Sequence, residues 1–189
     1  MKSLAAYWTS DLRDAAVIPS AETQAVNESG GAAVYGEVTE SGIMDFMDEV
    51  PFRHGNFVDL GSGRANVVAF VAANYGFTKC YGIEMSEARH RMAEKILLDV
   101  SANHIRGMER VHLQCGDLFD FNLFDMNVVF SDNLLFEDAG LHRMFCKVSD
   151  EMAPNTFFIT ARPAPDGFPR LCLEASLRVR TSWLSLIHI

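Results

Sequence analysis

The chain has 189 residues, 49% of them hydrophobic, and its 16 Lys+Arg against 25 Asp+Glu give a formal net charge of −9 at pH 7. This length suits one domain, and the apolar fraction excludes disorder as the general state. The acidic balance argues against independent binding to nucleic acid, which requires clustered bases to displace counterions from phosphates.

The first part of the chain passes from little periodicity to a helical pattern. Residues 1–33 end in the flexible step Ser29-Gly30-Gly31, so we expect them to form a weakly ordered lead-in. From residue 39, apolar side chains recur at helical spacing until Pro51, which predicts a helix over residues 39–50.

Beyond residue 56, short strand-like runs alternate with amphipathic helical runs. The predicted strands are residues 57–60, 80–84, 111–114, 126–130, 156–160 and 171–179. The predicted helices are residues 67–74, 88–100 and 141–148, and Ser86 is the expected N-cap of the second. This alternation is typical of right-handed β-α-β crossovers. The predicted fold class is therefore α/β, with a doubly wound, mostly parallel, Rossmann-like sheet.

We expect one domain over residues 34–180. The tail, residues 181–189, is apolar and has no turn signal, which favours a truncated or artefactual end. The sheet is therefore expected to lack its last strand and to leave an open edge, which is a hazard for aggregation.

The sequence pattern offers no targeting, membrane or metal signal. The amino terminus has no apolar run typical of a secretory signal, and residues 67–73 are far short of the ~20 residues that span a bilayer. The four cysteines show no C-x-x-C spacing, so no zinc or redox site is predicted. An intracellular protein without a metal is the expectation.

A glycine loop follows the first predicted strand. Gly61 and Gly63 let the backbone turn tightly and approach a ligand at the start of the next helix. A dinucleotide fingerprint would place a third glycine where Asn66 stands. Asp59, two residues before the loop, suits a cofactor that bears an amine and a sulfonium better than it suits a pyrophosphate.

Two more acids end the second and third predicted strands. Glu84 is placed to accept hydrogen bonds from both hydroxyls of a ribose, and Asp117 from the amine of an adenine. Any one of these acids could be a solvated loop carboxylate. Acids at the ends of three successive strands favour S-adenosylmethionine over NAD as the cofactor.

Five segments of the chain resemble motifs of one known family: residues 34–37, 57–63, 81–84, 116–117 and 131–136. The family is the disruptor-of-telomeric-silencing class of histone-lysine methyltransferases, the non-SET enzymes that modify a lysine on the nucleosome face. The D-L-G-S-G motif is shared by many class I methyltransferases, whereas Y-G-E and the Phe-ended D-N-L-L-F are more specific. The resemblance covers roughly residues 33–165. It implies a nuclear, S-adenosylmethionine-dependent N-methyltransferase that acts on a histone or nucleosome.

The resemblance also implies cofactor-binding roles, residue by residue. Tyr35 and Glu37 would belong to a loop that closes over the methionine end of the cofactor. Asp59, Gly61 and Gly63 would line its methionine and ribose side, and Asn66 stands where the family usually has glutamine. The remaining implied contacts are Glu84 to the ribose, Asp117 to the adenine, and Leu118 in place of an aromatic that packs on the adenine.

On the acceptor side, the resemblance implies three catalytic residues. Asp132 and Asn133 stand where the family has paired asparagines at the mouth of a lysine channel, and Phe136 would form an aromatic wall of that channel. Asp132 replaces an amide, so its charge could alter how the acceptor is held. No residue of the sequence is required as a general base.

Two other functions remain open. A class I methyltransferase for a small molecule or a non-histone protein would have the same glycine loop and acids, in which case the protein would be expected in the cytoplasm. A catalytically inactive cofactor-fold module that binds a partner is the second alternative, because Asp132 departs from the family and no basic chromatin-binding segment is visible. An NAD-binding domain ranks third because of Asn66.

Overall fold

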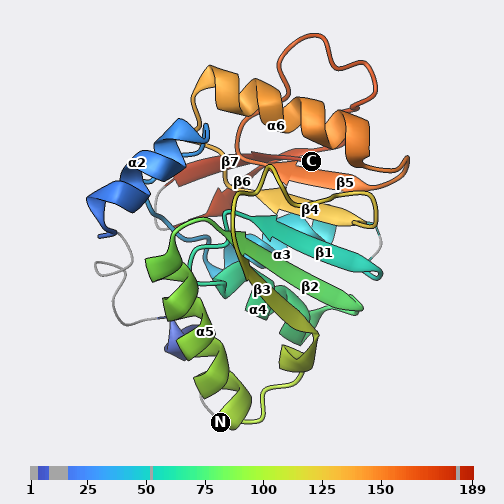
Figure 1. Cartoon of the computed structure of the whole chain (residues 1–189). Helices are drawn as coiled ribbons and strands as arrows, with labels where there is room; N and C mark the ends of the chain where they lie inside the picture. Colours follow the sequence, from blue (N-terminus) through green and yellow to red (C-terminus); the bar gives the residue numbers. More distant parts are fainter. Residues whose placement is uncertain (1–3, 9–16, 52, 182–183) are drawn as a thin grey trace.

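The computed structural model describes residues 4–8, 17–51, 53–181 and 184–189, and Figure 1 shows its fold. Within these residues, seven strands form one sheet in the order β3-β2-β1-β4-β5-β7-β6. The strands are β1 (Asn56–Leu60), β2 (Lys79–Glu84), β3 (Val111–Cys115), β4 (Val128–Ser131), β5 (Phe157–Thr160), β6 (Ser176–Arg180) and β7 (Leu184–His188). The pairs among β1 to β5 are parallel, and β7 is antiparallel to β5 and β6. The predicted α/β class and mostly parallel sheet are confirmed.

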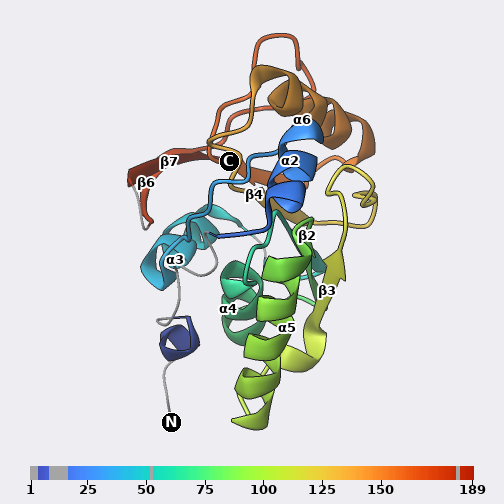
Figure 2. The ribbon, with the colours of Figure 1, turned by 60° about the vertical axis from the view of Figure 1, so that its left-hand side comes forward.

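Helices cover both faces of the sheet, as Figures 1 and 2 show. The α-helices are α2 (Ser20–Glu28), α3 (Glu40–Glu49), α4 (Asn66–Asn74), α5 (Glu87–Ala102) and α6 (Asp138–Glu151), and the short 3-10 turns are η1 (Leu4–Tyr7) and η2 (Met108–Arg110). The alternation along β1 explains the two layers. Phe57 packs into the core under α3, α4 and α5, whereas its neighbour Val58 packs into the core under α6. No helix in the described part of the chain is long and apolar enough to cross a membrane.

The expectation that the sheet lacks its last strand was wrong. Residues Leu184–His188 form β7, which pairs with all of β6 and reaches β5 at Thr160 and His188. The apolar character of this tail has a structural cause, because Ile187 and Ile189 are buried in the core. Residues 182–183 of the predicted tail lie outside the described residues.

The predicted lead-in contains a helix that the sequence pattern did not reveal. Within α2, the Glu22 carboxylate accepts hydrogen bonds from Ser86 Oγ at 2.5 Å and from the backbone N–H of Ala88 at 3.3 Å. Because these groups begin α5, Glu22 fastens α2 to the amino-terminal end of that helix. The Ser86 hydroxyl accepts from Arg89 N at 3.2 Å, so the predicted N-cap is confirmed. Residues 9–16 of the lead-in lie outside the described residues.

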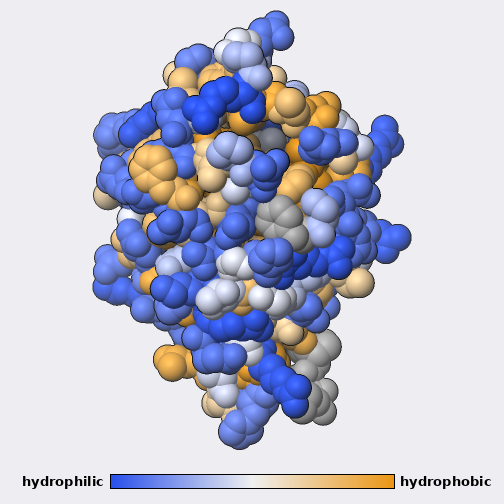
Figure 3. All heavy atoms as spheres, turned by 90° about the vertical axis from the view of Figure 1, so that its right-hand side faces the viewer, coloured by the Kyte–Doolittle hydropathy of each residue, from blue (hydrophilic) through white to orange (hydrophobic). Residues whose placement is uncertain are grey.

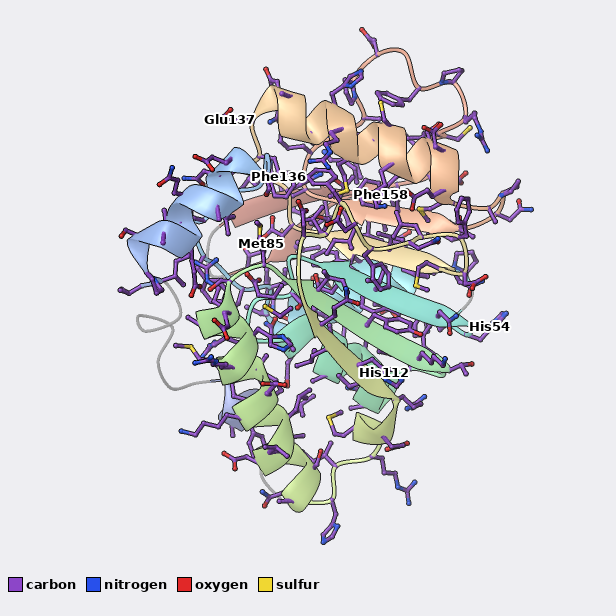
Figure 4. All side chains as sticks on the ribbon, viewed as in Figure 1. His54, Met85, His112, Phe136, Glu137 and Phe158 are labelled. Atoms are coloured by element: carbon purple, nitrogen blue, oxygen red, sulfur yellow. The ribbon has the colours of Figure 1, made fainter. Side chains whose placement is uncertain are left out.

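The two ends of the strands differ in what surrounds them. Figure 4 places Met85 and Phe136 toward α2, at the carboxyl ends of the strands, and His54 and His112 toward the opposite ends. Figure 3 views the molecule from the side of those opposite ends, where apolar residues are scattered among hydrophilic ones. The candidate site lies at the carboxyl ends, as expected for an open parallel sheet.

Candidate functional site

A cavity of about 360 Å³ opens at the carboxyl ends of the central strands. Its walls come from the glycine loop after β1, the residues that follow β2, β3 and β4, the end of α2, and the segment that follows α2. Seven of the predicted site residues line it together: Tyr35, Gly61, Glu84, Asp117, Leu118, Asp132 and Phe136. The tertiary structure thus brings Tyr35 and residues at the ends of four separate strands to one cavity.

The two positions of the loop require glycine for different structural reasons. Gly61 has φ +90°, and a Cβ built on it would meet no atom within 4 Å, so its backbone faces the open cavity. Gly63 has φ +54°, and a Cβ there would lie 2.5 Å from the ring of Tyr35. The first glycine therefore leaves room for a ligand, and the second lets Tyr35 close against the loop.

Glu84 holds a fixed carboxylate at the end of β2. Its Oε2 accepts from Gly63 N and its Oε1 accepts from Ser86 N, both at 2.8 Å. Burial raises the pKa of Glu84, while these N–H groups and the positive charge of Arg89 oppose the rise. Each oxygen keeps a further lone pair, so the carboxylate can accept from two ribose hydroxyls without moving.

Asp117 and Leu118 line the same cavity beyond β3. Asp117 Oδ1 accepts from Phe119 N at 2.9 Å, which orients the carboxylate. Leu118 packs against the apolar cluster under α6. The pair offers a hydrogen-bond acceptor beside an apolar surface, which suits the amine and the flat face of an adenine.

Glu37 is turned toward Arg64 of the glycine loop. Arg64 Nε lies 2.8 Å from Glu37 Oε1 in an ion pair whose side chains are 3% and 10% exposed. Tyr35 Oη donates to the same carboxylate at 2.5 Å, and burial followed by the charge of Glu37 raises the pKa of that tyrosine. The indole N–H of Trp8 donates to Arg64 O. The ion pair holds the Y-G-E segment against the glycine loop, and the indole bond holds Trp8 against the same loop.

A smaller cavity of about 30 Å³ adjoins the first and shares Tyr35, Gly36, Gly61 and Asp132 with it. Four of the predicted site residues line only this smaller cavity: Glu37, Asp59, Gly63 and Asn66. Asn66 Nδ2 donates to Val38 O at 3.0 Å, so this amide braces the Y-G-E segment. Asp59 is 3% exposed, and burial, then the charges of Asp132 and Glu84, hold its pKa well above its usual range.

The three predicted catalytic residues have different surroundings. Phe136 lines the large cavity beside Leu135, which is 55% exposed at its mouth. Asp132 lines both cavities, and burial raises its pKa to about 6. Asn133 lines neither cavity, because its Oδ1 accepts from Thr160 Oγ1 and from the backbone N–H groups of Ala161 and Arg162. Asn133 thus fixes the chain that follows β5.

Sequence reasoning missed Arg89. It is 3% exposed, its guanidinium carbon lies 4.8 Å from the centre of the Tyr35 ring, and it donates to Ala33 O at 2.5 Å. The available signal was its place on the buried side of α5, with Ala93 and Val100. Other lining residues that were not predicted include Val26, Ser29, Val34 and Met85.

These residues fit S-adenosylmethionine. Gly61 leaves open space, the carboxylates of Glu84 and Asp117 are held by backbone N–H bonds and can accept from hydroxyls and amines, and Leu118 and Met85 supply apolar walls. Within the described ranges, no group of three or more His, Cys, Asp or Glu side chains could hold a metal ion.

Comparison with known sequences gives one family. Residues 14–148, more than half of the chain, match the sequence model of the family described as "Histone methylation protein DOT1". No curated protein has a significant match to the chain.

Solved structures resemble the fold. An RNA methyltransferase from Salinibacter ruber, in complex with S-adenosyl-L-homocysteine, is 18% identical with a TM-score of 0.55, and the match covers 79% of this chain and 87% of that one. A putative S-adenosylmethionine-dependent methyltransferase from Methanococcus maripaludis is 16% identical, with a TM-score of 0.54 and coverages of 65% and 55%. Geranyl diphosphate C-methyltransferase from Streptomyces coelicolor A3(2) is 17% identical, with a TM-score of 0.52 and coverages of 62% and 43%. At these identities, the likeness shows a shared methyltransferase fold.

Proposed function

Because the chain belongs to the DOT1 histone methylation family, we propose that it methylates a lysine side chain of a histone within the nucleosome. It is an S-adenosylmethionine-dependent methyltransferase, and that molecule is its cofactor. The observation that carries the proposal is the arrangement of Asp132, Leu135 and Phe136, which follow β4 and line the cofactor cavity.

The proposed cofactor contacts follow from the cavity walls. Glu84 accepts from the ribose, Asp117 accepts from the adenine amine, and Leu118 contacts the adenine face. The smaller cavity takes the methionine end, where Asp59 faces the amine and Tyr35 closes over the glycine loop. Glu37 and Asn66 act as positioning residues, since their side chains bond to Arg64 and to Val38 O.

The acceptor must be a neutral amine, because an ammonium nitrogen has no lone pair. The bound cofactor supplies an activated methyl group on a sulfonium. Exposed Val34 and Leu135 and buried Phe136 make the mouth of the cavity largely apolar. Apolar surroundings disfavour the charged form of a lysine and so lower its pKa. This chain would therefore orient the amine and promote its neutral form.

The charge of the chain favours the histones over the DNA of a nucleosome. A net charge of −9 gives a favourable field toward basic histone surfaces and an unfavourable one toward phosphates. The proposal therefore places the protein in the nucleus, with the histone as its partner.

The experiment is transfer of radiolabelled methyl groups from S-adenosylmethionine. Reconstituted nucleosomes, free histones, RNA and a small-molecule extract are offered separately, and the labelled product is identified by mass spectrometry. We expect label on a histone lysine, strongest with nucleosomes. Label on RNA or on small molecules alone would contradict the proposal. If the protein binds S-adenosylhomocysteine but labels no acceptor, the binding-module alternative gains support.

A further inference from the structure

Asp132 has an unsatisfied carboxylate oxygen where the two cavities meet. Its Oδ1 is buried and has no hydrogen-bond partner within the part of the chain that the structure describes. The backbone N–H of Leu134 donates to the carboxyl and fixes its orientation. Asp132 lines both cavities, so its side chain lies where the large cavity meets the smaller one. A buried carboxylate oxygen without a donor is costly unless a ligand supplies one.

A second buried carboxyl stands beside Asp132. Asp59 lines the same cavity of about 30 Å³, and the charge of Asp132 is one of the causes that raise its pKa. Two close carboxyl groups out of water do not both ionise readily. Burial and the charges of Asp132 and Glu84 all disfavour the charged form of Asp59, whereas the Leu134 N–H favours the charged form of Asp132. Asp59 therefore keeps the proton of the pair, and Asp132 carries the charge.

The other ionisable groups around these cavities leave Asp132 as the available base. Glu37 is paired with Arg64, and Tyr35 donates to Glu37. Both oxygens of Glu84 accept backbone N–H bonds. The remaining charged groups of the large cavity are Arg89, which is a cation, and Asp117, which lies beyond β3, does not line the smaller cavity and is the proposed acceptor for the adenine amine.

We propose that Asp132 is the catalytic base that takes a proton from the ammonium group of the acceptor. This role rests on the proposed function, because it needs an amine acceptor. One N–H bond of the ammonium breaks and an O–H bond forms on the carboxylate of Asp132. The electron pair of the broken bond stays on nitrogen as the lone pair that attacks. After the product leaves, the proton passes from Asp132 to solvent. The asparagine amide that stands at this position in the family could not accept this proton.

The test compares the wild type with Asp132→Asn, which keeps the side-chain shape and removes the ionisation. Initial rates of methyl transfer to reconstituted nucleosomes are measured from about pH 5 to about pH 9. We expect the wild-type turnover to rise through a pH of about 6, where the carboxyl ionises. The variant is expected to lose this rise and roughly 10²–10⁴-fold of its turnover. An unchanged profile with turnover within about twofold of the wild type would overturn the proposal.

A second readout does not depend on turnover. Carboxyl ¹³C resonances of labelled aspartates are titrated in the wild type and in Asp132→Asn, without cofactor. We expect one resonance with a midpoint of about 6 to be missing from the variant. If every wild-type aspartate ionises at or below its ordinary pKa of about 4, the proposal fails.

Controls separate this role from the proposed function. Asp125→Asn makes the same chemical change at an exposed position and is expected to leave rate and profile unchanged. Binding of S-adenosylhomocysteine verifies that each variant is folded.

If Asp132→Asn fails to bind S-adenosylhomocysteine, Asp132→Glu is used in its place. Loss of the pH-dependent rise in turnover in this ionisable variant would overturn the role of Asp132. A wild type that binds the cofactor product but methylates no lysine would overturn both proposals, whereas an active wild type matched by Asp132→Asn overturns only the role of Asp132.

Discussion

The guanidinium of Arg64 and the carboxylate of Glu37 form a buried ion pair, with Nε and Oε1 2.8 Å apart. The pair joins two segments that lie 27 residues apart in the sequence: the Y-G-E segment and the glycine loop after β1. Arg64 also donates through Nη2 to Trp8 O at 3.0 Å. The same side chain therefore fastens the amino-terminal segment and the Y-G-E segment to one loop.

Removing Arg64 should strongly destabilise the protein. In Arg64→Ala, the carboxylate of Glu37 stays buried without its cation, which typically costs about 3–5 kcal/mol. The free energy of unfolding in urea measures the effect. The matched control is Arg91→Ala, whose pair with Glu87 is exposed and is worth only about 0.3–0.5 kcal/mol. Equal losses in the two variants would contradict the structural importance of the buried pair.

Glu84→Gln should weaken cofactor binding while the fold persists. The amide offers one acceptor oxygen where the carboxylate offers two, so one charge-assisted hydrogen bond to the ribose is lost and the NH2 group faces one of the two backbone N–H groups from which the carboxylate accepts. This loss costs about 1.5–3 kcal/mol, or roughly a 10- to 150-fold weaker affinity. Isothermal titration with S-adenosylhomocysteine measures it. Glu87→Gln, at an exposed side chain three residues on, is the control and should bind like the wild type. Unchanged affinity in Glu84→Gln would remove Glu84 from the proposed site.

Asp132 should make the protein less stable as the pH rises. Its pKa is raised from 3.8 to about 6, so the folded state holds this proton over a pH range in which the unfolded state has lost it. The free energy of unfolding therefore falls between about pH 4 and about pH 6 and stays lower above that range. Asp132→Asn removes the penalty, and we expect it to be more stable than the wild type by roughly 2–3 kcal/mol at neutral pH.

Urea unfolding of both proteins at several pH values checks this prediction. The difference in stability between Asp132→Asn and the wild type should be small near about pH 4 and should grow until about pH 6. A constant difference across that range would show that Asp132 ionises normally in the folded state. Asp125→Asn should show neither the gain nor the pH dependence.

Gly140→Ala should displace the end of α2, which forms part of the wall of the large cavity. Figures 1 and 2 show α2 beside α6, and a Cβ on Gly140 would lie 1.9 Å from the carbonyl oxygen of Gly30. Alanine favours the helix by about 1 kcal/mol, but this clash is with backbone and costs about 1–3 kcal/mol. Since Ser29 and Gly31 line the cavity, their displacement should also weaken cofactor binding.

Asp150→Ala provides the control for that clash. It lies exposed in the same helix and gains helix propensity without a steric conflict. Unfolding free energies and titration with S-adenosylhomocysteine are compared for the two variants. If Gly140→Ala were as stable as Asp150→Ala and bound S-adenosylhomocysteine with wild-type affinity, the contact between Gly140 and Gly30 would tolerate a Cβ and the prediction would be wrong.

Much of the fold could be predicted because its signals are local. Hydrophobic periodicity placed β1, β2 and β3 within a residue of their observed bounds, and two of the three acids at strand ends, Glu84 and Asp117, line one cavity. The last strand was missed because β7 is stabilised by pairing with β6 and by burial of Ile187, neither of which leaves a local pattern. Helix α2 was missed for a similar reason, since it is held by a hydrogen bond that Glu22 accepts from Ser86, which lies far along the chain.

The sequence by itself determined the sheet class, the glycine loop and the carboxylates at the strand ends, because the spacing of residues along one strand or helix decides them. Only the tertiary structure decided which side chains are free to act. It placed Arg89 against Tyr35, committed Asn133 to the chain after β5, and left Asp132 Oδ1 buried without a partner. These outcomes depend on burial and on contacts between distant segments, and periodicity along the chain contains neither.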